Sequence, residues 1–227
     1  SLREHSIYDC IINNSRNYSD EIALVSGDLR LTYGEFPIHV NSLARGLQKK
    51  GFEKGDRIGV LLNNCSEYTL LLAACSRLGL ITVCLNPRTS ADEMRKMLEQ
   101  AKPKALIFQK SYEQQADELR ELGIHRQLYC IDEASILSSS FDQLLDEDPS
   151  PLTESQPSVD DGWLIIPTAA VDGVPKGALL SQRNIMASAD VHLHHFGREA
   201  INGHLVVLPI FHVMGLTSAW ATFISGG

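Results

Sequence analysis

Short apolar runs alternate with helix-length segments up to about residue 131, and this alternation limits the fold more than any other feature of the chain. The runs that read as buried strands are residues 57–62, 80–85, 104–109 and 126–131. Helices are expected between them, at residues 66–78, 90–100 and 112–122. Strands that alternate with helices favour a largely parallel sheet that is covered on both faces.

The remaining elements have local start and stop signals. Ser6 is expected to cap a helix that runs to about Asn17, and Gly27-Asp28 marks a hairpin between residues 22–26 and 29–31. Two capping boxes are predicted, Thr32 with Glu35 and Ser90 with Glu93. Pro37, in the second turn of the helix after Thr32, is expected to distort the start of that helix.

A polar stretch at residues 142–161 contains three prolines among acids and serines, and it reads as a surface linker. We therefore expect a first α/β subdomain at residues 1–141 and a partial second one at residues 162–227. The second should hold a helix over residues 182–196 and a strand over residues 205–208. The predicted fold class is α/β, with two parallel-sheet subdomains of which the second is cut short.

Residues 164–181 carry the strongest chemical signal. Their apolar start, 164–166, reads as a buried strand that breaks at Pro167, and a glycine-bearing loop with Lys176 then leads to the helix-cap candidate Ser181. Such loops commonly hold phosphate, because glycines let backbone N–H groups approach the anion and a lysine adds positive charge. The spacing is not that of a Walker A loop. Taken alone, the loop is equally compatible with an ordinary turn between a strand and a helix.

This loop resembles the phosphate-binding loop of the adenylate-forming superfamily, which comprises AMP-forming acyl-CoA synthetases, luciferases and the adenylation domains of peptide synthetases. The family loop reads Thr-Ser-Gly-Thr-Thr-Gly-x-Pro-Lys-Gly, and residues 168–177 read Thr-Ala-Ala-Val-Asp-Gly-Val-Pro-Lys-Gly. Three further segments resemble segments of the family, and they follow one another in the family's order. They are residues 31–36, 79–88 and 209–216. Ordered matches across nearly the whole chain identify it as a member of this superfamily.

The resemblance implies that ATP is held by Thr168, Ala169, Ala170, Val171, Asp172, Gly173 and Lys176. The loop departs from the family pattern at four of these: Ala169 and Val171 replace hydroxyl residues, Ala170 replaces glycine and Asp172 replaces threonine. Losing hydroxyl donors and adding a negative charge both weaken triphosphate binding, whereas Asp172 could ligate Mg²⁺. We expect weak, strongly magnesium-dependent nucleotide binding.

An acyl pocket at His212 and Gly215 is also implied by the resemblance. His212 follows the strand expected at residues 205–208, and in α/β sheets the carboxyl ends of strands face the ligand. The alternative is a histidine satisfied within the core. No catalytic residue is assigned, because the carboxylate nucleophile of adenylation is already ionised and needs no base.

The implied function is that of an acyl- or aryl-acid:CoA ligase, the kind of enzyme found in fatty acid metabolism. Its substrates are a carboxylic acid, ATP with Mg²⁺, and CoA. Later family segments are missing, so the chain reads as an incomplete N-terminal fragment that is inactive alone and that exposes apolar surface, which makes a homo-oligomer plausible. The alternative function is a noncatalytic module of the same fold with weak or no nucleotide binding.

Composition excludes several other classes. The net charge of −8 on 227 residues disfavours nucleic-acid binding. Five cysteines without a C-x-x-C pair favour reduced thiols and a cytoplasmic location. The longest apolar stretch, residues 70–85, contains Arg77 and Gly79, so it reads as a helix plus a strand and not as a membrane span.

Three rival sites were weighed. No G-x-G-x-x-G follows a candidate strand, which rejects a dinucleotide site, and no G-x-S-x-G elbow indicates a hydrolase. His192 and His195 would share a helix face, but His194 points elsewhere and no acidic or cysteine partner completes a ligand set. No metal site is therefore predicted, and the three histidines read as a solvated helix end.

Overall fold

The computed structural model describes residues 4–121, 123, 127–132, 137–171, 174–197 and 203–227. At residues 169–171, 174 and 175 it describes the backbone alone. The calls on Asp172 and Gly173 therefore lie outside the described residues.

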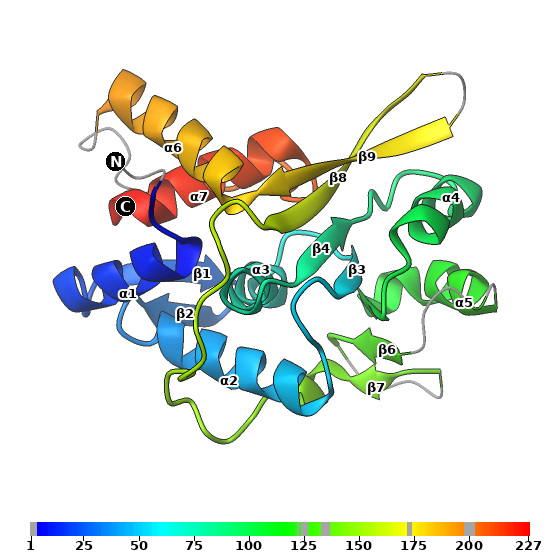
Figure 1. Ribbon diagram of the computed structural model, residues 1–227, viewed down its shortest axis with the longest axis horizontal. Coiled ribbons are helices and arrows are strands. Elements are labelled where there is room, and N and C mark those ends of the chain that lie inside the picture. Colours follow the sequence, from blue (N-terminus) through cyan, green and yellow to red (C-terminus); the bar gives the residue numbers. More distant parts are fainter. Residues whose placement is uncertain (1–3, 122, 124–126, 133–136, 172–173, 198–202) are drawn as a thin grey trace.

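A seven-stranded sheet forms the centre of the molecule, in the order β7-β6-β5-β3-β4-β8-β9 (Figure 1). Its strands are β3 (Arg57–Leu61), β4 (Ile81–Cys84), β5 (Ala105–Phe108), β6 (Gln127–Cys130), β7 (Ser139–Ser140), β8 (Gly162–Val171) and β9 (Val174–Ser181). All neighbours are parallel except β8 and β9, which form an antiparallel hairpin. The predicted α/β class with a mostly parallel sheet is confirmed.

Helices cover both faces of this sheet. They are α1 (Ile7–Asn17), α2 (Phe36–Lys49), α3 (Ser66–Leu78), α4 (Ala91–Ala101), α5 (Glu113–Glu121), α6 (Gln182–Phe196) and α7 (Val213–Ser225). Two short 3₁₀ turns, η2 (Lys110–Tyr112) and η3 (Phe141–Leu144), and a separate hairpin, β1 (Ile22–Ser26) with β2 (Leu29–Thr32), complete the fold. Side chains of α4 and α5 form one apolar core with the sheet, while α1, α2, α3, α6 and α7 contribute to the other.

Capping boxes start three of the helices. Ser6, Ser90 and Ser181 each accept a hydrogen bond from the backbone three residues on, and the side chain at that third position bonds back. The prediction at Thr32 was partly wrong. Thr32 and Glu35 do exchange side-chain and backbone hydrogen bonds, but α2 begins one residue after Glu35. Pro37 then lies in the first turn, where its missing N–H leaves no helix hydrogen bond unmade.

Residues 142–161 run over the surface and are tied to α2 and α3 by side chains. Asn41 donates to the carbonyl of Pro149 at 3.1 Å, and the buried Arg77 donates to the carbonyls of Leu152 and Glu154 at 2.9 and 2.7 Å. The strands that follow join the same sheet, because β8 pairs with β4 from Leu164. The division into two subdomains at this segment stays a prediction.

Two predicted boundaries after residue 161 were wrong. The strand expected to break at Pro167 continues to residue 171, since pairing with β4 ends at Ile165 and the missing N–H of Pro167 removes no bond from that ladder. Residues 205–208 form no strand, because no described strand pairs with them.

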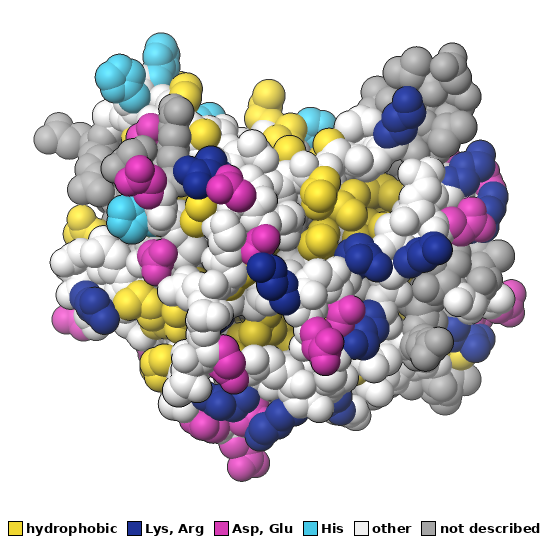
Figure 2. Space-filling view, viewed as in Figure 1, with side chains coloured by type: hydrophobic (Ala, Val, Ile, Leu, Met, Phe, Trp, Pro, Cys, Tyr) yellow, Lys and Arg dark blue, Asp and Glu magenta, His cyan; other side chains and the backbone are white. Residues whose placement is uncertain are grey.

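Apolar side chains gather on one face over β8 and β9 (Figure 2). Leu179 of β9 is 58% exposed, and Phe196 at the end of α6 is exposed to the same extent. Contiguous exposed apolar surface favours contact with another surface when it is large. Self-association through such groups remains a prediction.

Candidate functional site

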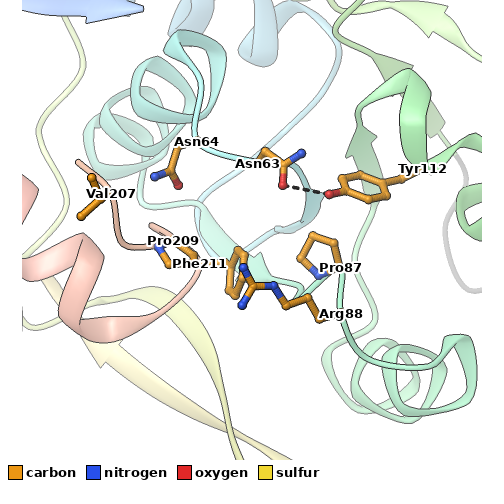
Figure 3. A pocket seen from close by; sticks show the side chains of 8 residues that line it. All are labelled: Asn63, Asn64, Pro87, Arg88, Tyr112, Val207, Pro209 and Phe211. Atoms are coloured by element: carbon orange, nitrogen blue, oxygen red, sulfur yellow. Dashed lines mark hydrogen bonds between the residues drawn. The ribbon is translucent and has the colours of Figure 1, made fainter. Parts of the chain in front are cut away.

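A cavity of about 300 Å³ opens at the carboxyl ends of β3 and β4 (Figure 3). It is lined by Asn63, Asn64, Pro87, Arg88, Tyr112, Val207, Pro209 and Phe211. This is the edge at which open α/β sheets bind their ligands. A second cavity, of about 320 Å³, lies at the other end of the sheet, where Phe52 and Lys54 precede β3 and Leu78 precedes β4. The first cavity is therefore the candidate site.

Asn63 connects one wall of the cavity to the segment that follows β5. Its Oδ1 accepts from the hydroxyl of Tyr112 at 2.8 Å, and its backbone N–H donates to Oε1 of Gln109 at 3.0 Å. Because β3 and β5 are parallel neighbours, their carboxyl ends meet here. Tyr112 thereby presents an aromatic ring to the cavity from a fixed position.

Asn64 connects the opposite wall. Its Nδ2 donates to the carbonyls of Val206 and Leu208 at 3.2 and 2.9 Å, and its Oδ1 accepts from the backbone N–H of Ile210 at 2.8 Å. The side-chain amide of one residue thus holds a backbone segment more than a hundred positions later in the chain.

Arg88 supplies the positive charge of the site. Its side chain is exposed and reaches the cavity from the turn after β4, where its own N–H donates to Oδ1 of Asn86 (Figure 3). Arg88 forms no ion pair with any residue that the structure describes. An unpaired guanidinium with the side-chain amide of Asn63 and a tyrosine ring in the same cavity can bind a phosphate or a carboxylate.

The predicted phosphate loop lies at the β8–β9 hairpin. Thr168 pairs with Lys176 across the two strands, and the Thr168 hydroxyl donates to the Lys176 carbonyl at 3.0 Å. The side chain of Lys176 is exposed. The expected order of strand, loop and helix is wrong in one respect, since a second strand precedes α6. Ala169, Ala170 and Val171 are described by backbone alone, so phosphate binding by this loop stays a prediction.

His212 and Gly215 lie at the start of α7. His212 is the N-cap residue and is exposed in this chain. Gly215 is buried against the backbone of Leu208 and Pro209, where a Cβ would collide with both carbonyl oxygens. Gly215 therefore lets the segment before α7 approach the helix. The role of both residues in an acyl pocket remains a prediction.

The other titratable clusters offer no competing site. Within the part of the chain that the structure describes, no three His, Cys, Asp or Glu side chains come close enough to hold a metal ion. The rings of His192 and His195 both contact Phe196. Burial raises the pKa of the thiols of Cys10, Cys75 and Cys84 to about 12, so these thiols stay protonated at neutral pH.

Two further expectations concern the state of the cysteines and the lack of a membrane span. All five cysteines are free thiols, of which Cys65 is half-buried and the other four are buried. Among the described helices, none is both long and apolar enough to cross a membrane.

Comparison with known proteins identifies the family of this chain. The AMP-binding enzyme family matches residues 12–227, and the chain belongs to this family. It is 26% identical to 4-coumarate–CoA ligase 1 of Petroselinum crispum over 96% of this chain and 41% of that protein. It is 28% identical to 2-succinylbenzoate–CoA ligase of Oceanobacillus iheyensis over 86% of this chain and 38% of that protein. The chain thus spans about two fifths of the length of these relatives.

Solved structures agree with the sequence relatives. The fold superposes with a TM-score of 0.90 on a Rhodopseudomonas palustris protein provisionally named a long-chain-fatty-acid CoA ligase, at 29% identity over all of this chain and 57% of that one. It also matches o-succinylbenzoate CoA synthetase of Bacillus subtilis, solved with an acyl-adenylate intermediate, at a TM-score of 0.79 and 25% identity over 96% of this chain and 54% of that one.

Sequence reasoning missed Asn63, Asn64 and Tyr112 as members of a site. A signal existed for two of them, because both asparagines directly follow an apolar strand. Arg88 lay inside the segment 79–88 that carried the family resemblance, but no role was assigned to it.

Proposed function

We propose that the protein to which this chain belongs is an AMP-forming acid–CoA ligase. The observation that carries the proposal is the composition of the cavity: Pro87 and Arg88 come from one segment that resembles the superfamily, and Pro209 and Phe211 come from another. Segments far apart in the sequence thus converge at the edge of the sheet where ligands bind. Membership of the AMP-binding enzyme family and the CoA-ligase relatives support the same reaction.

The proposed reaction has two steps. The carboxylate oxygen of the acid attacks the α-phosphorus of ATP, the bond to pyrophosphate breaks, and an acyl-adenylate forms. The thiol of CoA then attacks the acyl carbon, its proton is released and AMP leaves. Mg²⁺ and positive charge offset the charge on the departing pyrophosphate. We assign this task to residues 168–176, among which Lys176 is the exposed cation.

We assign to the cavity a phosphate-bearing part of a substrate. Arg88 can pair with a phosphate through two parallel N–H groups, Tyr112 offers a ring on which a base can stack, and Asn63 adds a polar wall. ATP and CoA both carry phosphates and an adenine ring. CoA is the better candidate, since the residues assigned to the ATP phosphates lie on the β8–β9 hairpin.

The acid itself is proposed only as a class. The two curated relatives named above act on 4-coumarate and 2-succinylbenzoate, both of which carry an aromatic ring and a carboxylate. A fatty acid is the second class, because one solved structure carries a fatty-acid ligase name. A cytoplasmic location is proposed from the five free thiols.

An activity assay tests the proposal. The longer protein, given Mg²⁺, ATP and each of 4-coumarate, 2-succinylbenzoate and a long-chain fatty acid, should release pyrophosphate with at least one acid and then form a thioester with CoA. Release that does not depend on added acid, or no release with a broad panel of carboxylic acids, would contradict it.

A second candidate is a noncatalytic module of the same fold. The altered loop favours it, since Ala169 and Val171 lack the hydroxyls of the family pattern and Asp172 adds a negative charge. Titration with ATP separates the two: the ligase binds Mg²⁺–ATP, whereas a module without nucleotide binding shows no saturable heat.

A further inference from the structure

Residues 205–211 form a cavity wall that lacks the support of a sheet. The segment pairs with no strand among the described residues, it turns where the N–H of Val207 donates to the carbonyl of Leu205 at 3.0 Å, and Leu205 and Val207 are 83% and 74% exposed. Val207, Pro209 and Phe211 nevertheless line the cavity. Something other than a strand ladder must therefore fix their position.

Full burial of side chains is found at the end of this wall next to α7. Ile210 and Phe211 are buried, and Gly215 allows the carbonyls of Leu208 and Pro209 to lie against the first turn of that helix. Before Leu208, the side chain of Val206 is partly buried against the core, whereas Leu205 and Val207 are exposed.

Asn64 holds that exposed stretch. Both amide hydrogens are used, toward the carbonyls of Val206 and Leu208, and the amide oxygen accepts from Ile210. One planar amide thus bonds residues 206, 208 and 210 together, because its NH2 group has two donors and its oxygen is an acceptor.

We propose that Asn64 is the positioning residue of this wall, and that its side-chain amide, acting in place of a strand, sets the width of the cavity and hence its affinity for the phosphate-bearing substrate. The ligand part of this statement rests on the proposed function. Asn63 gives a natural contrast, because it lines the same cavity but bonds the opposite wall through Tyr112.

Amide hydrogen exchange of the 227-residue chain tests the positioning. In Asn64→Ala, the Ile210 amide should exchange about tenfold faster, as expected for the loss of one hydrogen bond of about 1.4 kcal/mol. The amides of β3 and β5 should keep their rates, and Asn63→Ala should leave Ile210 unchanged. Ile210 exchanging at the wild-type rate in Asn64→Ala would overturn the proposal, and so would faster exchange throughout the sheet, which would make Asn64 a general stabilising residue.

Calorimetric titration of the longer protein with CoA and, separately, with ATP measures the effect on substrate binding. Asn64→Ala should weaken binding of the ligand that occupies the cavity about tenfold, under conditions in which urea unfolding shows that the variant is folded. Unchanged affinity of a ligand that binds the wild type would contradict the proposal. If neither ligand binds the wild type but Ile210 exchange rises as expected, the positioning role stands and the assigned substrate is wrong.

Discussion

Gly215, in the first turn of α7, lies so close to the carbonyl oxygen of Leu208 that a Cβ on this glycine would stand 2.8 Å from it. The Pro209 carbonyl is closer still. Both oxygens are held by hydrogen bonds, since Asn64 donates to the Leu208 carbonyl at 2.9 Å and the N–H of His212 donates to the Pro209 carbonyl at 3.1 Å. The start of α7 and the wall of the cavity are therefore fitted to each other through a residue without a side chain.

Gly215→Ala should destabilise the chain, because the added methyl must displace backbone. We expect a loss of about 1–3 kcal/mol in the free energy of unfolding, typical of overpacking. Urea denaturation measures it. Met214→Ala is the matched control, since Met214 is 62% exposed in the same turn and should change stability by less than about 0.5 kcal/mol. Equal effects of the two substitutions would contradict the close fit.

Arg77 and Arg45 allow a matched comparison of a buried and a half-buried cation that bind the same segment. Arg77 is buried, bonds the carbonyls of Leu152 and Glu154, and lies over the ring of Tyr8. Arg45 bonds Ser150 in a similar way at the surface. We expect Arg77→Ala to lower the free energy of unfolding by about 2–4 kcal/mol and Arg45→Ala to lower it by less than about 1 kcal/mol. Similar losses in urea denaturation would show that burial does not strengthen this attachment.

The helix starts and most strand positions could be predicted because their signals are local. The capping boxes at Ser6 and Ser90 need only four residues each, and the helix expected over residues 66–78 matches α3. The β8–β9 hairpin could not be predicted. Pro167 reads as a break, and it is tolerated only because pairing with β4 has already ended, which no local pattern reveals.

The site was less predictable than the fold. Asn64 is important through its bonds to residues 142 to 146 positions away, and such a contact leaves no periodic trace in the sequence. The strand expected at residues 205–208 is absent for a related reason, because a short apolar run forms a strand only where another strand is available to pair with it.

Acid should weaken the attachment of Lys104 to the turn before β3. Burial of Asp56 alone would raise the pKa of its carboxyl, but hydrogen bonds from Lys104 and the Glu53 backbone, with the charges of Lys104 and Arg57, lower the pKa overall. The ionised carboxyl therefore stabilises the fold when the pH is above its pKa in the unfolded chain, which is ~3.9. This contribution is lost as the pH falls through the lower pKa that the carboxyl has in the folded protein.

Asp56→Asn should therefore lower the free energy of unfolding at pH 7 and leave it nearly unchanged at the acid end, which flattens the pH profile below about pH 5. Urea denaturation across pH 3–7 measures it. Asp28→Asn, at an exposed turn, is the control and should keep the wild-type profile. A wild-type profile in Asp56→Asn would contradict the prediction.

The altered loop should bind nucleotide through magnesium. In the longer protein, Lys176→Ala should weaken Mg²⁺–ATP about tenfold or more, since a charge-assisted hydrogen bond contributes ~1.5–3 kcal/mol. Asp172→Thr should increase the affinity for metal-free ATP, because it removes a negative charge from the loop. Lys49→Ala, on α2, serves as the control. If calorimetry finds both affinities unchanged, the loop does not bind the phosphates of ATP.

The central claim is that the cavity at the carboxyl ends of β3 and β4 binds a substrate phosphate through Arg88. Titration of CoA into the longer protein and into its Arg88→Ala variant, with the exposed Arg30→Ala as control, tests it most directly. We expect saturable binding of CoA that Arg88→Ala weakens at least tenfold, equivalent to about 1.4 kcal/mol, while Arg30→Ala leaves the affinity unchanged. Equal CoA affinity in all three proteins would contradict it.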